Sequence, residues 1–324
     1  MPNNPNLLLL DKHAVESLLR PDDVLDAVRE AFTLHSDDAG RVFPVVREAL
    51  PTHGVFGIKS GDVPSQQLLG FKAAGFWPAN RQGGHEPHQA TIMLIDPATG
   101  RPLCVIDGNQ VTTVRTGAAG ALGLRYLARS ESRRLCVFGN GVQARIQVRF
   151  ALMQHPDITH VDYVTQTDDP DPDFEAHVSA LNVAARLATD RNAAVAAADI
   201  VITATPGAGP LFDAAAVQPG THINCVGADT KGKRELPAGL LDRVQLFVDD
   251  HTQARQIGET QWAPDTPAIE IGDLLTERVR FERRAQDITV FDMTGLALQD
   301  LTVARLLYER ASAGGKGVLI PWPW

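Results

Sequence analysis

Four basic residues in the first part of the chain stand among apolar or small residues instead of in charged runs. They are Arg47, Lys59, Lys72 and Arg115. A single cation in such a place is commonly a solvated side chain at a strand edge, with its apolar stem on the surface. Four of them in one region favour a binding site for an anion, because ammonium and guanidinium groups bind carboxylates through charge-assisted hydrogen bonds.

A second group of residues has the spacing of a dinucleotide-binding loop. The motif G-x-G-x-x-A follows the apolar run 135–138, precedes the helical stretch 142–153, and consists of Gly139, Asn140, Gly141, Val142, Gln143 and Ala144. The first glycine permits a tight turn, the second lets the backbone approach a pyrophosphate, and the alanine permits close packing of helix on strand. The N-terminus of the helix then receives the phosphate charge. We expect positions 139–143 to contact a dinucleotide; a purely structural turn is the alternative.

The end of the next predicted strand bears on the choice between NAD and NADP. An acidic residue there binds the ribose 2′-OH of NAD, whereas an arginine binds the 2′-phosphate of NADP. Here the strand ends in Thr165 and Gln166, followed by Asp168 and Asp169, and no Lys or Arg occurs between positions 149 and 186. Carboxylates would repel a 2′-phosphate, so we expect NAD (NADH) as the cofactor and NADP only as the less favoured choice.

The predicted elements separate these two groups of residues. Residues 11–39 have the periodicity of amphipathic helices, and residues 41–111 alternate short apolar runs with turn residues, as in an antiparallel sheet of hairpins. Farther on, helical stretches alternate with short apolar strands at 135–138, 161–165, 200–204, 222–226, 246–248 and 288–291. This pattern is typical of α/β proteins, in which helices cover both faces of a parallel sheet. We therefore predict a Rossmann-type doubly wound parallel sheet plus a second, α+β domain.

Length and charge narrow the range of functions. A chain of 324 residues exceeds the roughly 250 to 300 residues that one hydrophobic core organises, so we expect two domains. The net charge of −9 disfavours nucleic acid as a partner. Neither a long apolar run nor a signal-peptide core is visible, so we expect no membrane partner and a cytoplasmic location. The three cysteines lack metal-ligand spacing, and no metal is expected.

Several motifs occur in an order that resembles a known family. They are K-x5-P-x-N from Lys72, D-x2-T-G-x-P from Asp96, T-x2-R-T-x-A-A from Thr112, G-x-G-V-Q-A-R from Gly139 and G-A-D-x2-G-K-x-E-L from Gly227. Across residues 40–305 the chain resembles the ornithine cyclodeaminase and mu-crystallin family. The motifs are specific to this family but not to one substrate within it.

The resemblance implies a homodimer whose subunits interconvert amino acids and imino acids by hydride transfer. It implies a NAD(P)-binding Rossmann domain, 119–304, and a discontinuous domain, 1–118 with 305–324, that binds a small imino or amino acid and dimerises. The apolar tail, 318–324, is expected to pack on the first domain or on a partner subunit.

Motif positions suggest roles for single residues. By resemblance, Arg47, Lys72 and Arg115 bind the substrate carboxylate, and Asp229 is the acid–base group near the nicotinamide. We expect Lys72 and Asp229 to be catalytic, and Thr116, Thr205 and Asp229 to contact the cofactor together with Thr165 and Gln166. From local sequence alone, Ala-Asp-Thr-Lys-Gly-Lys around Asp229 is typical of a turn, and only the Gly-Ala-Asp motif favours a functional role.

Lys59 departs from the pattern of the diamine-cyclising members of the family, which carry an acid suited to a substrate ammonium there. A cation at this position would repel ornithine or lysine and attract a second carboxylate. We therefore expect an imine reductase for a small dicarboxylate, with iminosuccinate to aspartate as the most concrete version. The alternatives are an alanine dehydrogenase or ketimine reductase, an ornithine cyclodeaminase that forms proline and ammonia, and a crystallin-like ligand-binding protein.

Overall fold

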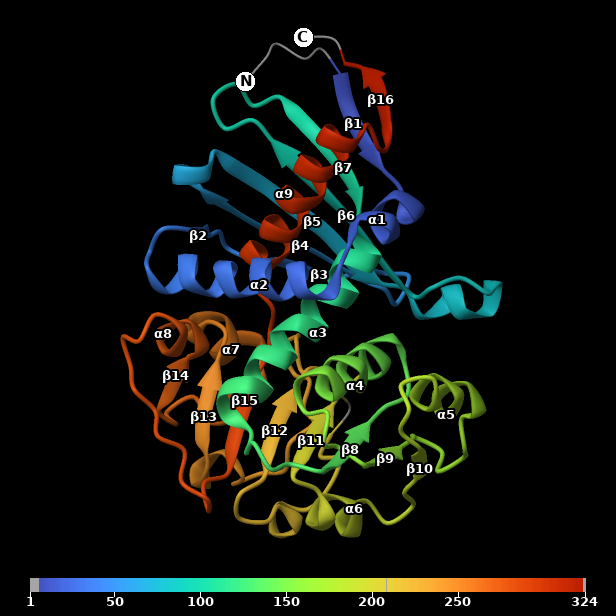
Figure 1. The fold of residues 1–324 in the computed structure, drawn as a ribbon, viewed down its shortest axis with the longest axis vertical. Helices are drawn as coiled ribbons and strands as arrows, with labels where there is room; N and C mark the ends of the chain where they lie inside the picture. The colour runs from blue at the N-terminus through green and yellow to red at the C-terminus, as the bar shows by residue number, and fades with distance from the viewer. Residues whose placement is uncertain (1–5, 208, 323–324) are drawn as a thin grey trace. The chain divides into compact units, whose positions relative to one another are not determined.

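The chain folds into two compact units, each built on its own sheet (Figure 1). The computed structural model describes residues 6–207 and 209–322. Unit 1 comprises Met1–Arg115 and Leu296–Trp324, and unit 2 comprises Thr116–Gly295. The predicted fold class, a doubly wound parallel sheet with a second α+β domain, is confirmed.

Unit 1 contains a largely antiparallel sheet in the order β16-β1-β7-β6-β5-β4-β2, with β3 also paired to β4. Strands β1 and β7 run parallel, and every other strand pair of this sheet in the described residues is antiparallel. The strands are β1 (Asn6–Leu10), β2 (Arg41–Val42), β3 (Val46–Ala49), β4 (Val55–Val63), β5 (Leu68–Phe76), β6 (His88–Ile95), β7 (Pro102–Asp107) and β16 (Val318–Pro321). Because β16 pairs with β1, this part of the apolar tail returns to the first domain, as expected; Pro323 and Trp324 lie outside the described residues.

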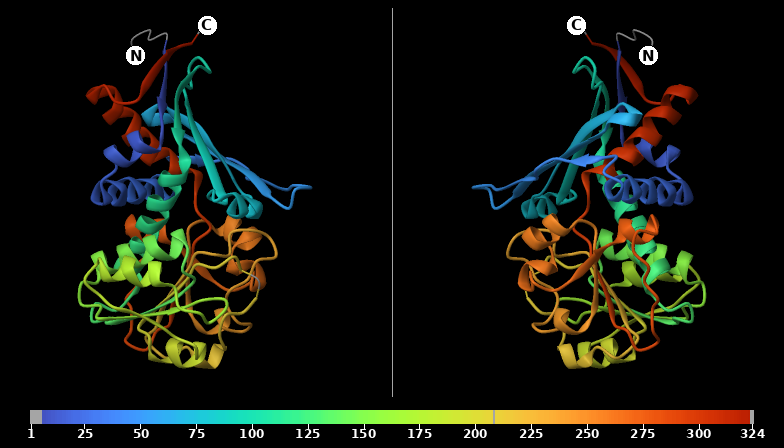
Figure 2. Two further views of the ribbon diagram at one scale, coloured as in Figure 1. Left: turned by 90° about the vertical axis from the view of Figure 1, so that its right-hand side faces the viewer. Right: turned by 90° about the vertical axis from the view of Figure 1, so that its left-hand side faces the viewer.

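The helices of unit 1 lie on one side of its sheet (Figure 2). They are α1 (Lys12–Leu18), α2 (Pro21–Ser36) and α9 (Ala297–Gly314), with the short 3-10 helices η1 (Pro64–Gln66) and η2 (Pro78–Gly83) in loops. Helix α2 begins at Pro21, where a proline loses no hydrogen bond, and Asp22 and Asp23 favour the positive end of the helix dipole. Its buried face carries Val24 and Val28, which fulfils the predicted periodicity.

Helix α9 packs directly on the sheet over two glycines in register, Gly61 and Gly70, and comes closest at Gly70. A Cβ atom on Gly61 would lie 3.5 Å from Leu298, and one on Gly70 would lie 2.8 Å from Leu301. The whole of α9 therefore belongs to unit 1, whereas the sequence analysis placed only residues 305–324 there. At the other boundary, unit 1 ends at Arg115 within helix α3 (Gly108–Leu127), and the sequence analysis drew the line after residue 118.

Unit 2 contains a sheet in the order β10-β9-β8-β11-β12-β15-β13-β14 in which each neighbouring pair is parallel. The strands are β8 (Arg134–Phe138), β9 (His160–Val164), β10 (Ala185–Leu187), β11 (Ile200–Thr203), β12 (His222–Cys225), β13 (Gln245–Val248), β14 (Ala268–Glu270) and β15 (Thr289–Asp292). The helices besides α3 are α4 (Val142–Gln154), α5 (Pro172–Ser179), α6 (Arg191–Ala197), α7 (His251–Ile257) and α8 (Ile271–Leu275), with the 3-10 helices η3 (Ala214–Ala216), η4 (Leu241–Arg243) and η5 (Glu259–Trp262).

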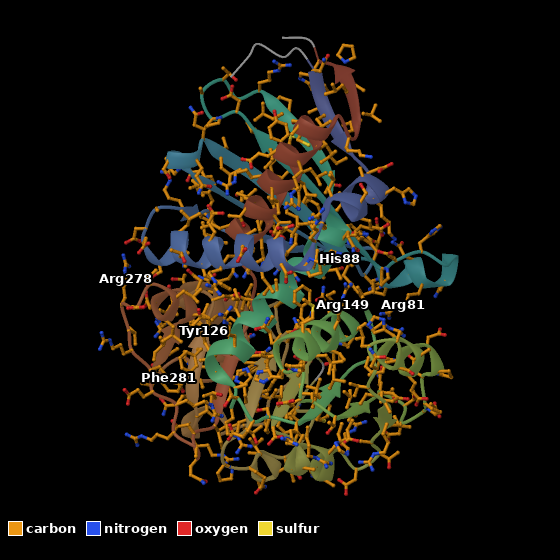
Figure 3. All side chains as sticks on the ribbon, in the orientation of Figure 1. Arg81, His88, Tyr126, Arg149, Arg278 and Phe281 are labelled. Carbon is orange, nitrogen blue, oxygen red and sulfur yellow. The ribbon has the colours of Figure 1, made fainter. Side chains whose placement is uncertain are left out.

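The central strands of unit 2 are buried along their whole length, which explains their continuous apolar runs in the sequence. Two apolar clusters fill the unit, one around Val148 and Tyr163 and the other around Ile223 and Val290. Phe281, labelled in Figure 3, packs against Phe247 of β13 with ring centroids 4.9 Å apart. No α-helix in the described part of the chain is both long and apolar enough to span a membrane.

Candidate active site

Three of the four predicted cations project from adjacent strands of unit 1 to the same face of the sheet. Lys59 on β4 and Lys72 on β5 are register partners, so their side chains lie side by side. Arg47 on β3 is the register partner of Gly57, which is two residues from Lys59 and hence on the same face. A Cβ atom on Gly57 would lie 3.3 Å from Cδ of Arg47, so the arginine stem crosses β4 where no side chain obstructs it.

A buried carboxylate on α9, Asp300, binds two of the cations. Lys72 Nζ lies 2.8 Å from Asp300 Oδ1 and 2.7 Å from Oδ2. Arg115 donates from Nε to Asp300 Oδ1 at 3.1 Å and from a terminal nitrogen to Gln299 Oε1 at 3.1 Å. Lys72 also donates to Thr112 Oγ1 at 3.2 Å. The predicted cations therefore surround an acid that the sequence analysis missed.

Burial and the charges of the cluster shift the pKa values of Lys72 and Asp300. Burial lowers the pKa of Lys72 to about 7, with Asp300 opposing the shift and the charges of Arg115 and Lys59 adding to it. Burial alone would raise the pKa of Asp300, but the nearby Lys72, Arg115 and Lys59 hold this pKa below its usual value. Asp300 is therefore a carboxylate, and Lys72 can take up or release a proton at neutral pH.

The two glycines of the dinucleotide motif differ in what surrounds them. Gly139 has φ +102°, and a Cβ atom there would lie 2.6 Å from the carbonyl oxygen of Ala204, so the fold itself requires this glycine. A Cβ atom on Gly141, at the start of α4, would meet nothing within 4 Å. Within the described chain, Oε1 of the adjoining Gln143 is buried without a hydrogen-bond partner, and Val142 is 57% exposed. Open space over Gly141 at a helix N-terminus fits a bound pyrophosphate.

Asn140, in the same motif, is held by the protein. Its side-chain amide donates to Asp171 at 2.7 Å, while Arg145 donates to the Asn140 carbonyl at 3.0 Å and lies 3.3 Å from Asp171. Asp171 also caps helix α5. This network fixes the shape of the loop, so Asn140 would meet a cofactor through its backbone.

A cation that the sequence analysis overlooked lies beside the loop after β9. Thr165 is buried and donates to the carbonyl of Asp169 at 3.0 Å, whereas Gln166 is exposed. Asp168 has φ +58° and forms an ion pair of 3.4 Å with Arg191, the first residue of α6. Arg191 escaped notice because it lies beyond the stretch considered, and the fold returns it to the loop.

Glu235, a motif residue without an expected role, joins the ends of β11 and β12. Its Oε1 accepts hydrogen bonds from the backbone and the hydroxyl of Thr205, at 2.8 and 2.7 Å. Its Oε2 accepts from Thr203 Oγ1 and the Gly227 backbone, both at 2.8 Å. Burial raises the pKa of Glu235, and these four hydrogen bonds oppose the rise. The hydroxyl of Thr205 is thus engaged with Glu235, which fixes the loop that precedes Asp229.

Asp229 follows β12 and is about one-third exposed, with 35% of its side chain accessible. Its Oδ1 lies 2.7 Å from Lys233 Nζ and accepts from Thr230 Oγ1 at 3.1 Å. Together with the Gly139–Gly141 loop and Thr205, it occupies the carboxyl edge of the parallel sheet, where α/β proteins bind ligands. Thr116 is buried near the N-terminal half of α4, where its carbonyl accepts from Gln147 at 2.8 Å.

The family model described as the ornithine cyclodeaminase/mu-crystallin family matches residues 6–315. The chain belongs to this family. It is 32% identical to the iminosuccinate reductase of Paracoccus denitrificans over 320 residues, which cover 95% of this chain and 98% of that protein. It is also 32% identical to the alanine dehydrogenase of Archaeoglobus fulgidus, covering 96% of this chain and 97% of that protein.

Solved structures of family members have the same fold. An archaeal alanine dehydrogenase dimer with bound NAD has a TM-score of 0.90 at 32% identity, covering 97% of this chain and 99% of that chain. The iminosuccinate reductase of P. denitrificans in complex with NAD⁺ has a TM-score of 0.87 at 31% identity, again covering 97% and 99%. The predicted family membership is confirmed, and so is the prediction of an oxidoreductase, since the relatives of this family member are reductases and dehydrogenases.

Proposed function

We propose that the chain is a NAD-dependent reductase of a small imino acid, with iminosuccinate, reduced to aspartate, as the substrate. The register pairing of Lys59 with Lys72 carries this proposal. Asp300 supplies one negative charge to this cluster, and, besides burial, the charges of Arg115 and Lys59 still lower the pKa of Lys72, so a ligand with more than one negative charge suits the cluster. Iminosuccinate has two carboxylates, whereas the imino acid of alanine has one. The similarity to a named iminosuccinate reductase supports the same substrate.

Each cation then has a part in binding or in proton transfer. Arg47 and Arg115 bind the α-carboxylate, because guanidinium groups suit bidentate contacts, and Lys59 binds the second carboxylate. NADH, when bound, supplies the hydride that reduces the imine carbon. The imine nitrogen needs a proton, and we assign proton transfer to Lys72, whose pKa is about 7, and to Asp229.

The cofactor motif of unit 2 supports NAD as the dinucleotide. The open space over Gly141, at the N-terminus of α4, suits the pyrophosphate, as described above. Asp168 would repel a 2′-phosphate and neutralises Arg191, the nearby cation that could bind one. The archaeal alanine dehydrogenase dimer holds NAD, and the iminosuccinate reductase of P. denitrificans holds NAD⁺.

The uncovered face of the unit 1 sheet supports a homodimer. A row of register partners across β1, β7, β6 and β5 on this face is apolar and half-buried: Leu9, Val105, Met93 and Phe71. The adjoining row on the helix-covered face, which includes Ile106 and Ile92, is fully buried. Sheets commonly bury such a face against a second layer, and a second copy of the chain supplies a matching one. The archaeal alanine dehydrogenase is described as a dimer.

The test measures NADH oxidation with oxaloacetate plus ammonium, which together supply iminosuccinate, beside pyruvate plus ammonium. Ammonia release from ornithine with NAD is measured in parallel. Preferential turnover of the four-carbon dicarboxylate is the expected result. Preference for pyruvate, or proline and ammonia from ornithine, would reject the dicarboxylate. NADH binding without turnover of any imino acid would indicate a ligand-binding protein instead.

A further inference from the structure

Lys233 is a motif residue that the proposed reaction leaves without a role, although its ammonium group contacts the proposed acid–base group. Nζ lies 2.7 Å from Asp229 Oδ1 and 3.3 Å from the carbonyl oxygen of Gly227. The hydroxyl of Thr230 donates to the same Oδ1 at 3.1 Å. One carboxylate oxygen of Asp229 thus accepts two hydrogen bonds from its own turn.

The turn that carries Lys233 is fixed from outside. The Gly232 amide donates to Gln261 Oε1 at 2.7 Å, and the indole of Trp262 donates to the Lys233 carbonyl at 2.9 Å. The stem of Lys233 passes over Gly207, where an added Cβ atom would lie 3.3 Å from the lysine Cβ. The backbone of Lys233 is therefore held by the segment at η5, and the lysine stem is directed towards Asp229.

We propose that Lys233 is a positioning residue for Asp229: it holds the side chain as a carboxylate and fixes which of its oxygens faces the reaction. This inference rests on the proposed function, in which Asp229 transfers a proton. An ammonium group at hydrogen-bond distance stabilises the charged form of a carboxylate. It also offsets part of the negative charge at the carboxyl edge of the sheet.

The pairing bears on proton transfer in both directions of the reaction. In amine oxidation, a proton would leave the substrate nitrogen for Asp229 and the C=N bond would form as the Cα–H bond breaks; NAD⁺, when bound, would supply the hydride acceptor. A carboxylate can accept that proton, and a neutral acid cannot. In imine reduction the same steps run in reverse, and Asp229 returns to the carboxylate form that Lys233 stabilises.

The test compares Lys233→Met with Lys233→Arg in the full-length protein, and Lys231→Met serves as the matched control. Lys231 is exposed in the same turn. Methionine keeps the apolar stem over Gly207 and loses the charge, while arginine keeps the charge. We measure kcat with the imino acid turned over by the parent, the isotope effect of deuterated NADH on kcat, and the dissociation constants of NADH and NAD⁺.

For Lys233→Met, kcat is expected to fall about 10-fold to 100-fold, the range for loss of one charge-assisted hydrogen bond, while the Kd of NADH stays within about 3-fold. The isotope effect should rise, Lys233→Arg should recover most of kcat, and Lys231→Met should match the parent. An unchanged kcat, or an equal loss in both Lys233 variants with folding intact, would overturn the proposal. Weakening of NADH binding in step with kcat would instead make Lys233 a cofactor contact.

A binding measurement keeps the proposal testable if no imino acid is turned over. Without Lys233, the uncompensated carboxylate should favour the positively charged nicotinamide of NAD⁺ over the neutral ring of NADH. The ratio of the two dissociation constants should therefore move towards NAD⁺ in Lys233→Met and stay unchanged in Lys233→Arg. A ratio that is equal in all variants would reject the electrostatic role, whereas absent turnover alone would reject only the proposed function.

Discussion

Nζ of Lys72 and Oδ2 of Asp300 lie 2.7 Å apart in the interior of unit 1, although the two residues are separated by 228 positions in the sequence. Their side chains are only 4% and 1% exposed. The pair joins the sheet to α9 and provides Lys72 with its counter-ion. The proposed anion site therefore contains a fixed anion of its own, and we expect a substrate carboxylate to bind beside it.

Replacement of this internal anion should cost stability. Asp300→Asn leaves Lys72 and Arg115 without their shared carboxylate, so the free energy of unfolding should fall by about 3 to 5 kcal/mol. Urea unfolding measures it. The control is Asp23→Asn, which breaks the partly exposed pair of Asp23 with Arg310 at 2.7 Å and should cost about 1 kcal/mol or less. Equal losses of unfolding free energy in both variants would show that the buried pair contributes no more to stability than the partly exposed pair.

Lys59 should select for a second carboxylate. Lys59→Met removes one charge-assisted contact, so the KM for iminosuccinate should rise about 10-fold or more, while the KM for a monocarboxylic imino acid changes little. Steady-state kinetics with the two substrates measures the difference. Lys12→Met, at an exposed pair with Glu86, is the control for a general loss of charge. An equal effect on both substrates would assign Lys59 to the α-carboxylate or to the fold.

The two motif glycines should respond differently to alanine. Gly141→Ala has room for its methyl group in the protein, so the fold should be unaffected, while the Kd of NADH rises about tenfold or more because the methyl group occupies space for the pyrophosphate. Gly139→Ala should destabilise the protein by about 1 to 3 kcal/mol or more, because of its positive φ and its contact with Ala204. Thermal unfolding and fluorescence titration separate the two effects. Equal changes in stability and in the Kd of NADH for both variants would contradict the assignment of Gly139 to the fold and of Gly141 to pyrophosphate binding.

Asp168 should contribute to the choice of cofactor. Asp168→Ser removes the carboxylate and releases Arg191 from its ion pair, so the preference in kcat/KM for NADH over NADPH should fall about 10-fold. The variant Asp168→Ser with Arg191→Ala should regain discrimination, because no cation is left to bind a 2′-phosphate. An unchanged preference in the single variant would place the ribose elsewhere.

His222 should make stability depend on pH. It lies between Thr289 Oγ1 and Asn224 Oδ1, both at 2.9 Å, and burial lowers its pKa to about 3. The unfolded chain binds a proton below pH about 6.5 and the folded chain does not, so this residue lowers the free energy of unfolding as pH falls from 6.5 towards 3, by up to about 1.4 kcal/mol per pH unit. His222→Gln should remove that part of the slope in urea unfolding between pH 6 and 4. If the free energy of unfolding changed equally with pH in the parent and in His222→Gln, His222 would not be a buried neutral histidine.

The sequence predicted the parts of the fold that depend on local patterns. Buried parallel strands such as β11 and β15 are continuous apolar runs, and the glycine motif lies between a strand and a helix as expected. The edge strands β10 and β14 were missed because they have three residues each and are largely half-exposed, which leaves little pattern to detect.

The site was predicted less completely than the fold because its contacts are made by distant residues. The four cations could be recognised by their apolar surroundings, but no residue near Lys72 in the sequence indicates that Asp300 binds it. The one signal was the acid itself, between Leu298 and Leu301 on the buried face of a helix. Arg191 reaches Asp168 only through the β9–β10–α6 connection, which no local spacing reveals.

The division of unit 1 between the two ends of the chain has a consequence during synthesis. Unit 2 is one continuous segment, Thr116–Gly295, so all of it is synthesised before α9 and β16. Domains fold as units while the chain grows. Unit 2 can therefore fold before the sheet of unit 1 has received Asp300, the counter-ion of Lys72. The contact of Lys72 with Asp300 therefore forms only after α9 has been made.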